Sequence, residues 1–369
     1  ILMGEIMFHS GIAPVLIKTI DKWLGRIPGR LSMLSVSVGT ILSTLTGTSL
    51  ASVAVLGSVL VPEMEKHGYK KSMSLGPILG SGGLAMMIPP SALAVLCGAI
   101  AELSIGRILM AIIFPGLLMA FIYAAYIIVR CLLQPSIAPT YEVETVPLSE
   151  KLLATVKYVL PQGIVVFLVV GVIFLGVATP SEAAATGCLG TFALAICYRR
   201  LSWEVLKKSV FGTLNVTGMI FLIMCGATAF SQILSFSGAT TGITNLATQL
   251  DVHPMVIIIM MQIIILFLGG LLDVVSIMMI TLPIFVPVVI TLGYDPIWFA
   301  VLFLLNIEMA GTSPPFGLSL FVMKGVAPKD TTMADIYWAA LPFIGLDLIA
   351  MVILMTFPSI ALWLPGLMG

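Results

Sequence analysis

The composition of this 369-residue chain is that of a protein embedded in a membrane. Apolar residues make up 59 % of it, charged residues 9 %, and the mean hydropathy is +1.16. These values lie well outside the usual range of water-soluble domains. The 17 basic and 17 acidic residues give a net charge of zero, so the chain has no large electrostatic field to gather nucleic acid. A soluble domain and a nucleic-acid-binding protein are both excluded.

The cysteines and histidines form no pattern that holds a metal or a cofactor. All five cysteines lie inside or at the ends of apolar segments without CxxC spacing, and the three histidines are far apart along the chain. We therefore expect small core residues, with no transition metal and no organic cofactor. The cysteines are Cys97, Cys131, Cys188, Cys197 and Cys225.

The first predicted elements are an amphipathic helix and a hairpin. Residues 12–24 are amphipathic and predict a helix that lies along the membrane surface. Residues 31–45 and 50–61 are apolar, but each is shorter than the roughly 20 residues that cross a membrane. They meet at Gly47-Thr48-Ser49, which predicts a hairpin that enters the membrane and returns to the same side.

The next predicted element is a helix broken in its middle. Residues 72–100 are apolar but contain Gly80, Gly82-Gly83 and Pro89-Pro90. Proline removes a backbone donor and clashes with the preceding turn, so a double proline at membrane depth should split the helix.

The central part of the chain reads as complete membrane spans. A proline-containing polar loop over 134–150 and an amphipathic surface helix over 203–214 interrupt them. The predicted spans cover residues 105–133, 158–177, 183–198 and 218–236.

A second hairpin and a second broken helix follow. Residues 255–271 and 274–292 are apolar arms that meet around Asp273. Residues 297–322 contain the run Gly311-Thr312-Ser313-Pro314-Pro315, which predicts a break like the first one. Residues 333–364 predict a last span.

The two hairpin regions align without a gap at an offset of 225 residues. Pro62 falls on Pro287, Gly68-Tyr69 on Gly293-Tyr294, and Pro89-Pro90 on Pro314-Pro315. Matches at rigid and turn-forming residues are what a shared backbone would require. The sequence therefore predicts an internal repeat.

The basic residues predict the orientation, because loops rich in Lys and Arg stay in the cytoplasm. If both ends of the first hairpin face the cytoplasm, every one of the 17 basic residues except Arg107 falls on that side. Five crossings then separate Gly68 from Gly293. An odd number inverts the second copy relative to the first, as in the inverted repeats of secondary transporters.

Broken helices suggest where the chemistry lies. Their ends expose backbone amides and carbonyls at the bilayer midplane, where they can bind anions and cations, and hard cations such as sodium prefer oxygen ligands. The offset of 225 places Thr48 on Asp273, so both hairpin tips carry a side-chain oxygen. The first tip is rich in hydroxyls: Ser43, Thr44, Thr46, Thr48, Ser49 and Ser52.

Four acidic residues lie in or beside apolar segments, where an ionisable group is costly unless it pairs or binds an ion. For Asp273 we favour an ion-binding role over a structural one, while Glu308 fits either role. Asp347 reads as structural, and so does Glu182, because Ser181-Glu182 after Pro180 predicts a helix cap with an acidic first turn. Clustered hydroxyls at the tips and breaks have a structural alternative too, since Ser and Thr often hydrogen-bond within membrane helices.

Enzymes and channels fit less well. The chain has no HExxH, GxSxG or P-loop motif, so hydrolase and ATPase chemistry lacks its residues. A channel would need a continuous pore ring. A membrane enzyme remains the competing class, and a stand-alone divalent-anion/sodium symporter is the alternative within transport.

Two groups of motifs resemble the large membrane subunit of the tripartite ATP-independent periplasmic (TRAP) transporters. The first runs from Gly47-Thr48-Ser49 through Val61-Pro62-Glu63, Gly82-Gly83 and Pro89-Pro90-Ser91; the second is Thr312-Ser313-Pro314-Pro315-Phe316. The resemblance covers essentially the whole chain.

This resemblance implies an all-helical elevator-type transporter, driven by sodium, that imports an organic anion such as a C4-dicarboxylate, a sugar acid or an oxo acid. It implies a periplasmic binding protein that delivers the substrate, a small Q-type membrane subunit, and a multi-pass position among the lipids of the bacterial inner membrane. The implied transport domain is 31–103 with 254–330, and the implied scaffold is 1–30, 104–253 and 331–369.

The resemblance also implies the binding residues. One sodium site would join the first tip to a break at Gly82-Gly83, and the other would join the second tip to Gly311-Thr312-Ser313, with the substrate between the tips. The implied sodium ligands are Gly47, Thr48, Ser49, Gly82, Gly83, Gly269, Gly270, Asp273, Gly311, Thr312 and Ser313. The implied substrate contacts are Thr48, Ser49, Pro90, Ser91, Pro315 and Phe316.

The chain departs from the family in two places. The family's usual first helices are missing ahead of Ile1, and Ile1 lies in an apolar run unlike a signal peptide, so we expect a fragment or the downstream half of a fusion. The first tip reads Gly-Thr-Ser where Gly-Ser-Ser is common, a change that keeps the hydroxyl.

Overall fold

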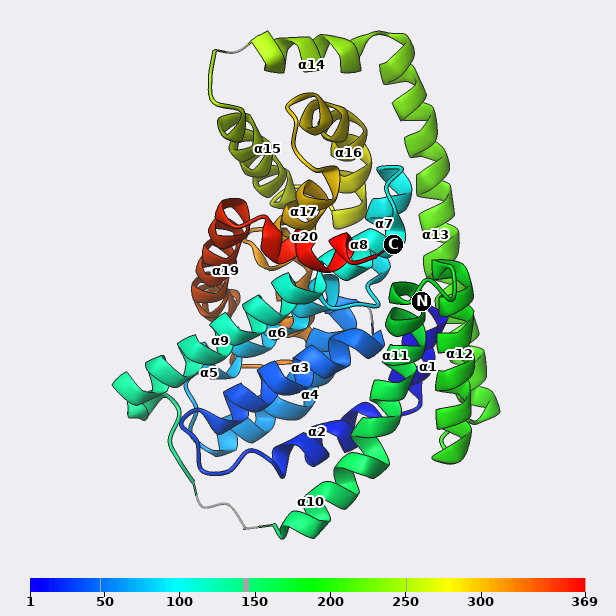
Figure 1. Cartoon of the computed structure of the whole chain (residues 1–369). Coiled ribbons are helices and arrows are strands. Elements are labelled where there is room, and N and C mark those ends of the chain that lie inside the picture. The colour runs from blue at the N-terminus through cyan, green and yellow to red at the C-terminus, as the bar shows by residue number, and fades with distance from the viewer. Residues whose placement is uncertain (47, 142–145, 250, 369) are drawn as a thin grey trace.

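The computed structural model describes residues 1–46, 48–141, 146–249 and 251–368, and the elements that it gives are helices (Figure 1). The first part of the chain forms α1 (Leu2–His9), α2 (Ala13–Asp21), α3 (Arg30–Thr46), α4 (Ser49–Lys66), α5 (Lys71–Ser74), α6 (Gly76–Met87) and α7 (Ala92–Ile100). The middle part forms α8 (Ile105–Ala111), α9 (Ile113–Leu133), η1 (Pro135–Ile137), α10 (Leu148–Ala154), the π-helix η2 (Thr155–Val159), α11 (Leu160–Phe174), α12 (Pro180–Cys197), α13 (Trp203–Phe236) and α14 (Ala239–Gln249). The last part forms α15 (Pro254–Gly269), α16 (Val274–Thr291), α17 (Pro296–Thr312), α18 (Leu318–Val326), α19 (Met333–Thr356) and α20 (Ser359–Gly366).

The described helices include several that can cross a membrane. Five are long and apolar enough: Ile105–Leu133, Leu148–Phe174, Trp203–Leu234, Val274–Thr291 and Met333–Thr356. The pair Lys71–Met87 and Ala92–Ile100, bent by 46°, counts as a sixth when its two parts are taken as one span. The chain is therefore a multi-pass membrane protein, as its composition predicts.

Both predicted hairpins are present as pairs of helices. α3 and α4 form the first, and α15 and α16 the second. The bounds of α16 lie 225 residues after those of α4, which is the offset found in the sequence. In Figure 1, α3 and α4 lie in the lower half of the view and α15 and α16 in the upper half, with α6 and α17 between them.

The ends of the two hairpins share a backbone feature. Gly68 follows α4 with φ +75° and Gly293 follows α16 with φ +80°. Glycine adopts this left-handed conformation without a side-chain clash, which makes it suited to ending a helix. The sequence match at these positions therefore reflects a shared turn.

The predicted proline breaks are confirmed, whereas a break at Gly82-Gly83 is wrong. α6 ends at Met87 and α7 begins at Ala92, with the cis Pro89-Pro90 bond between them. α6 runs helically through Gly82 and Gly83, where the absence of side chains brings neighbouring helices close.

The second break matches its prediction. α17 ends at Thr312, α18 begins at Leu318, and the cis Pro314-Pro315 bond lies between them.

Four other elements differ from the sequence prediction. The span predicted over 158–177 begins earlier, at Leu148, within the loop predicted over 134–150. The separate surface helix over 203–214 is wrong: α13 continues through it for 34 residues, about 50 Å at the usual helical rise, and no proline interrupts this stretch. The last predicted span divides into α19 and α20 at Phe357-Pro358, because proline ends the first helix. The short helix α14 was not predicted.

The start of α12 is capped, but the capping residue is Thr179 rather than the predicted Ser181. Thr179 precedes the helix, and its backbone N–H and its hydroxyl each donate to Glu182, both at 2.8 Å. The Glu182 N–H donates in return to the Thr179 hydroxyl at 3.4 Å. This reciprocal capping box accounts for Glu182 as a structural residue.

The two broken helices form the centre of the protein. Every residue of α6 is buried, as is nearly all of α17. Glycines allow this packing: a Cβ at Gly76 would lie 2.5 Å from the Ala339 carbonyl oxygen, and a Cβ at Gly80 would lie 2.5 Å from the Phe343 ring. Close backbone approach at small residues is how membrane helices gain van der Waals contact when water does not drive them together.

One polar pair joins the second hairpin to the second broken helix. Asn306 of α17 donates through Nδ2 to the Gln262 carbonyl oxygen at 2.7 Å and to Gln262 Oε1 at 2.8 Å. Both residues are buried, so these bonds fix the register of α15 against α17 in a place where their loss would leave polar groups unpaired.

Candidate functional site

The first hairpin tip contacts the second broken segment. Thr48 is the exposed N-cap of α4, in an extended conformation, and Ser49 is the buried first residue of that helix. The Ser49 hydroxyl oxygen lies 3.5 Å from that of Ser319 in α18. Gly47 lies outside the described residues. Two parts of the chain 270 residues apart thus meet through hydroxyl groups.

The first tip also packs against α6. A Cβ at Gly82 would overlap the Val53 side chain and would lie 3.5 Å from the Ser49 carbonyl oxygen. The first tip therefore lies beside Gly82, which is in a continuous helix.

Gly83 lies against a buried carboxyl group from α17. A Cβ at Gly83 would overlap the carboxyl atoms of Glu308. Glu308 is 1 % exposed, and neither of its carboxylate oxygens has a hydrogen-bond partner among the described residues. A carboxylate ion is costly to bury in such a place unless a proton or a cation neutralises it.

Two further polar side chains lie in the same region. Asp347 of α19 is 1 % exposed and accepts a hydrogen bond from the hydroxyl of the buried Tyr123 in α9. This partner accounts for Asp347 as a structural residue, as its sequence context predicts. Glu308 differs, because no such partner satisfies it among the described residues.

Asp273 has the same place in the second hairpin that Thr48 has in the first. Each is the N-cap of the second arm, Thr48 of α4 and Asp273 of α16. Asp273 Oδ2 accepts from the N–H groups of Val275 and Ser276 at 3.0 and 3.1 Å, and Oδ1 accepts from the Ser276 hydroxyl. The carboxylate is exposed, so its remaining lone pairs are accessible.

The second tip packs closely against the second break. A Cβ at Gly269 would overlap the Ala310 Cβ, so α15 ends in direct contact with α17. A Cβ at Gly270 would lie 3.7 Å from Pro315 Cδ and 3.9 Å from the Pro314 carbonyl oxygen. Gly269 and Gly270 therefore lie against the second broken helix, whereas the hydrogen bonds of Asp273 described above are with its own helix.

The second break is a tight turn between two helix ends. Thr312 is buried, and its hydroxyl donates to the Met309 carbonyl at 3.1 Å; Ser313 caps α17 in an extended conformation. Gly317 N–H donates to the Ser313 carbonyl at 3.0 Å, and a Cβ at Gly317 would lie 2.7 Å from the Gly311 carbonyl oxygen. Only glycine fits this turn.

The predicted substrate-contact residues occupy two separate breaks. Ser91 is buried and caps α7, accepting from the Ala94 N–H at 3.3 Å, while Pro90 is half-buried. Pro315 and Phe316 are exposed, with 58 % of Phe316 accessible. The contacts described above link the second break, but not Ser91, to the hairpin tips.

Sequence reasoning missed Ser319 and Gly317. Ser319 lies beside Ser49, and a Cβ at Gly311 would be 3.9 Å from its hydroxyl. It follows the second Pro-Pro pair by four residues, but only the folded chain brings it to the first tip. The result is a polar centre where the first tip, the end of α17 and the start of α18 converge.

The electrostatics of this centre come from helix ends. Each hairpin tip and each break joins the C-terminus of one helix to the N-terminus of the next. Carbonyl groups carry partial negative charge at the former, and amides carry partial positive charge at the latter. The arrangement can thus bind a cation and an anion side by side within the membrane.

This fold, with two helical hairpins meeting two broken helices, defines a multi-pass membrane transporter. The chain matches the family described as "Tripartite ATP-independent periplasmic transporter, DctM component" over residues 1–360. It belongs to that family, the large permease subunits of the TRAP transporters, and it is a transporter rather than an enzyme.

Individual relatives agree with this assignment. The chain is 30 % identical to the C4-dicarboxylate TRAP transporter large permease protein DctM of Pseudomonas aeruginosa, over 100 % of this chain and 85 % of that protein. It is 28 % identical to the ectoine/5-hydroxyectoine TRAP transporter large permease protein UehC of Ruegeria pomeroyi, over 100 % and 84 %.

A solved structure shares the fold. The crystal structure of the YdaH transporter of Alcanivorax borkumensis superposes with a TM-score of 0.65 at 16 % identity, covering 97 % of this chain and 84 % of that one. At this identity the likeness concerns the fold alone.

Proposed function

We propose that this permease imports an organic anion across the bacterial inner membrane and is driven by a sodium gradient. The observation that supports this most is the convergence of both hairpin tips on the second break, where helix C-termini and N-termini meet. Opposed helix ends at membrane depth suit the joint binding of a cation and an anion.

The proposed repeat is inverted. α4 and α16 match in bounds at the offset of 225, and Gly68 and Gly293 end them with the same turn. Placing basic loops in the cytoplasm puts five crossings between these turns, so the first hairpin enters from the cytoplasm and the second from the periplasm.

The proposed sodium sites lie at the two tips. At the first, the Ser49 oxygens lie beside Gly82 and Ser319, and Thr48 is the neighbouring N-cap of α4. At the second, the carboxylate of Asp273 caps the start of α16, three residues after the Gly270 that ends α15. Hydroxyl, carbonyl and carboxylate oxygens suit a hard cation. The substrate carboxylate would bind between the tips, with Thr312 and Ser313 of the second break.

We propose an elevator movement of two units. The transport unit comprises residues 31–103 and 254–330, which contain both hairpins and both broken helices. The scaffold comprises 1–30, 104–253 and 331–369. In support, α6 packs on both arms of the first hairpin, α17 packs on both arms of the second, and α6 and α17 pack on each other, which makes these elements contiguous.

The proposed partners are a periplasmic binding protein and a small membrane subunit. The isethionate TRAP transporter permease protein DctMQ of Oleidesulfovibrio alaskensis is 28 % identical to this chain, over 99 % of it but only 57 % of that protein, so the relative carries a further segment. The substrates in the names of the relatives, C4-dicarboxylates, isethionate and ectoine, lead us to propose a small organic acid.

Uptake by reconstituted protein tests this proposal. The permease, with its small subunit, is placed in proteoliposomes, and radiolabelled acid is supplied with the periplasmic binding protein. Uptake should require an inward sodium gradient and should fall to background when the gradient is collapsed by a sodium ionophore. Equal uptake without sodium would overturn the coupling, and equal uptake without the binding protein would indicate a stand-alone symporter.

A further inference from the structure

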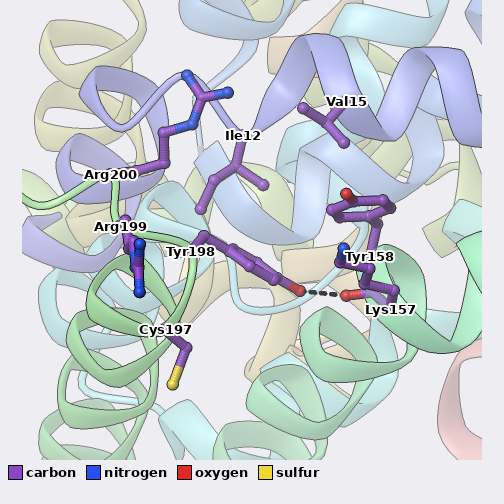
Figure 2. Close-up of a pocket in the computed structure, with 8 residues that line it drawn as sticks. All are labelled: Ile12, Val15, Lys157, Tyr158, Cys197, Tyr198, Arg199 and Arg200. Atoms are coloured by element: carbon purple, nitrogen blue, oxygen red, sulfur yellow. Dashed lines mark hydrogen bonds between the residues drawn. The ribbon is translucent and has the colours of Figure 1, made fainter.

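A pocket outside the hairpin centre carries three cationic side chains. The pocket has a volume of about 230 Å³ and lies between α2, the π-helix η2 and the end of α12. Figure 2 shows Arg199 and Arg200 on one side of it, and Lys157 with Tyr158 on the other. Among the residues that the structure describes, the lining contains no acidic side chain.

Among the described residues, these cations have no ionic partner of their own. None of Lys157, Arg199 and Arg200 forms a salt bridge within 4.0 Å in the described part of the chain. All three are exposed at the pocket. The nearby end of α12 does not neutralise them fully, because backbone N–H groups cap its carbonyls: Arg199 donates to Ile196 at 2.9 Å and Arg200 to Ala195 at 2.8 Å. The positive charge of the pocket therefore favours the binding of an anion.

The backbone holds Arg199 in an unfavourable conformation. Its φ is +54°, in the left-handed region, where the position after a helix normally carries glycine and any side chain has a steric cost. The steric cost of an arginine at this position is explained if its charge binds a ligand in the pocket. The π-helical turn that carries Lys157 is another irregular element of a kind common at functional sites.

A hydrogen bond and ring packing fix the pocket's shape. The Tyr198 hydroxyl donates to the Lys157 carbonyl oxygen at 2.5 Å, and the rings of Tyr158 and Tyr198 lie with their centroids 5.8 Å apart (Figure 2). The end of α12 is thereby held to η2, so the cations of the two segments face one space.

The surface next to the pocket is apolar and exposed. Leu160 and Ile164 of α11 are 52 % and 51 % exposed, and Leu189 and Ile196 of α12 are 69 % and 60 % exposed. Ile196 directly precedes the pocket-lining Cys197. In a membrane protein such a surface contacts acyl chains, so an anion bound here can be attached to a lipid.

We propose that this pocket binds the phosphate-bearing headgroup of an anionic phospholipid, with its acyl chains along α11 and α12. The cations lie on the side that our proposed orientation assigns to the cytoplasm, where basic pockets between helices bind such headgroups. The bound lipid joins the amphipathic helix α2 to α11 and α12. All three helices belong to the proposed scaffold.

Native mass spectrometry of the purified transporter tests the proposal, with phosphatidylglycerol and phosphatidylcholine titrated separately. We expect phosphatidylglycerol to bind more tightly, and expect Arg199→Gly and Arg200→Gln each to weaken it about five-fold. Arg199→Gly is the sharper variant, because glycine accepts the backbone conformation and the thermal midpoint should be unchanged or higher. Lys207→Gln, which removes an exposed cation outside the pocket, should leave binding unchanged.

A second measurement locates the lipid and separates it from free phosphate. In a variant whose other cysteines are replaced, phosphatidylglycerol should slow maleimide labelling of the exposed Cys197, and inorganic phosphate should not. Equal binding of both lipids, or Arg199→Gly binding like the parent, overturns the proposal. Protection of Cys197 by inorganic phosphate alone would assign the pocket to a soluble anion and overturn the lipid.

Discussion

Replacing Asp273 with serine is expected to raise the sodium concentration for half-maximal uptake at least about ten-fold, equivalent to about 1.4 kcal/mol of sodium binding. The carboxylate is the one anionic side chain at the second tip in our proposal, and a hard cation gains most from such a ligand. The N–H groups of Val275 and Ser276 donate to Asp273. A serine hydroxyl oxygen can accept such a hydrogen bond and still cap α16. The loss should therefore concern sodium rather than folding, and proteoliposome uptake at graded sodium concentrations measures it.

Asp295 provides a matched control. It caps α17 in the same manner, accepting from the Ile297 N–H at 2.7 Å and the Trp298 N–H at 3.4 Å. Asp295→Ser thus removes a second capping carboxylate at a position away from the tips, and the sodium dependence should be that of the parent. If both variants shift the sodium dependence equally, or if neither does, Asp273 is not a sodium ligand.

Replacing Gly269 with alanine is expected to abolish most transport and to lower the free energy of unfolding by about 1–3 kcal/mol. The new Cβ would overlap the Cβ of Ala310, which has no rotamer to move away, so α15 and α17 must separate. That separation opens the contact of the second tip with the break. Thermal unfolding in detergent and the initial rate of uptake report the two effects.

The adjacent glycine is the control for this substitution. A Cβ at Gly270 would meet its nearest atom at 3.5 Å, an ordinary contact, and Gly270 has helical φ and ψ. Gly270→Ala should therefore be close to the parent in stability. A result in which both alanine variants unfold alike would mean that the close packing of Gly269 on Ala310 is not what holds the second tip.

Much of the fold could be predicted because rigid and turn-forming residues mark it directly. Proline has a fixed φ and no backbone donor, so Pro89-Pro90 and Pro314-Pro315 predict breaks from the sequence alone. Glycine reaches the left-handed region that other residues avoid, so Gly68 and Gly293 predict turns. The first hairpin tip followed from two apolar arms that are each too short to cross a membrane, and the second from two apolar arms that meet around Asp273. The placement of Thr48 and Asp273 at equivalent N-caps follows from the same offset.

The parts that failed depend on contacts between distant segments. Nothing local distinguishes a glycine that breaks a helix from one that lets a neighbour approach, and Gly82 and Gly83 proved to be of the second kind, against Val53 and Glu308. Ser319 has no motif of its own, and its meeting with Ser49 exists only in the folded chain. The amphipathic pattern over 203–214 does not mark a separate helix, because α13 continues through these residues.

We propose that the two hairpins enter the membrane from opposite sides. Labelling of one matched pair of residues by an impermeant reagent tests this most directly. Lys66 and Thr291 are the last residues of α4 and α16, lie 225 residues apart and are both exposed. In a cysteine-free background, Lys66→Cys and Thr291→Cys are treated with a membrane-impermeant maleimide in right-side-out and inside-out vesicles. If the hairpins enter from opposite sides, Thr291→Cys reacts in right-side-out vesicles and Lys66→Cys in inside-out vesicles. Reaction of both cysteines from the same side would show that the two hairpins are not inverted.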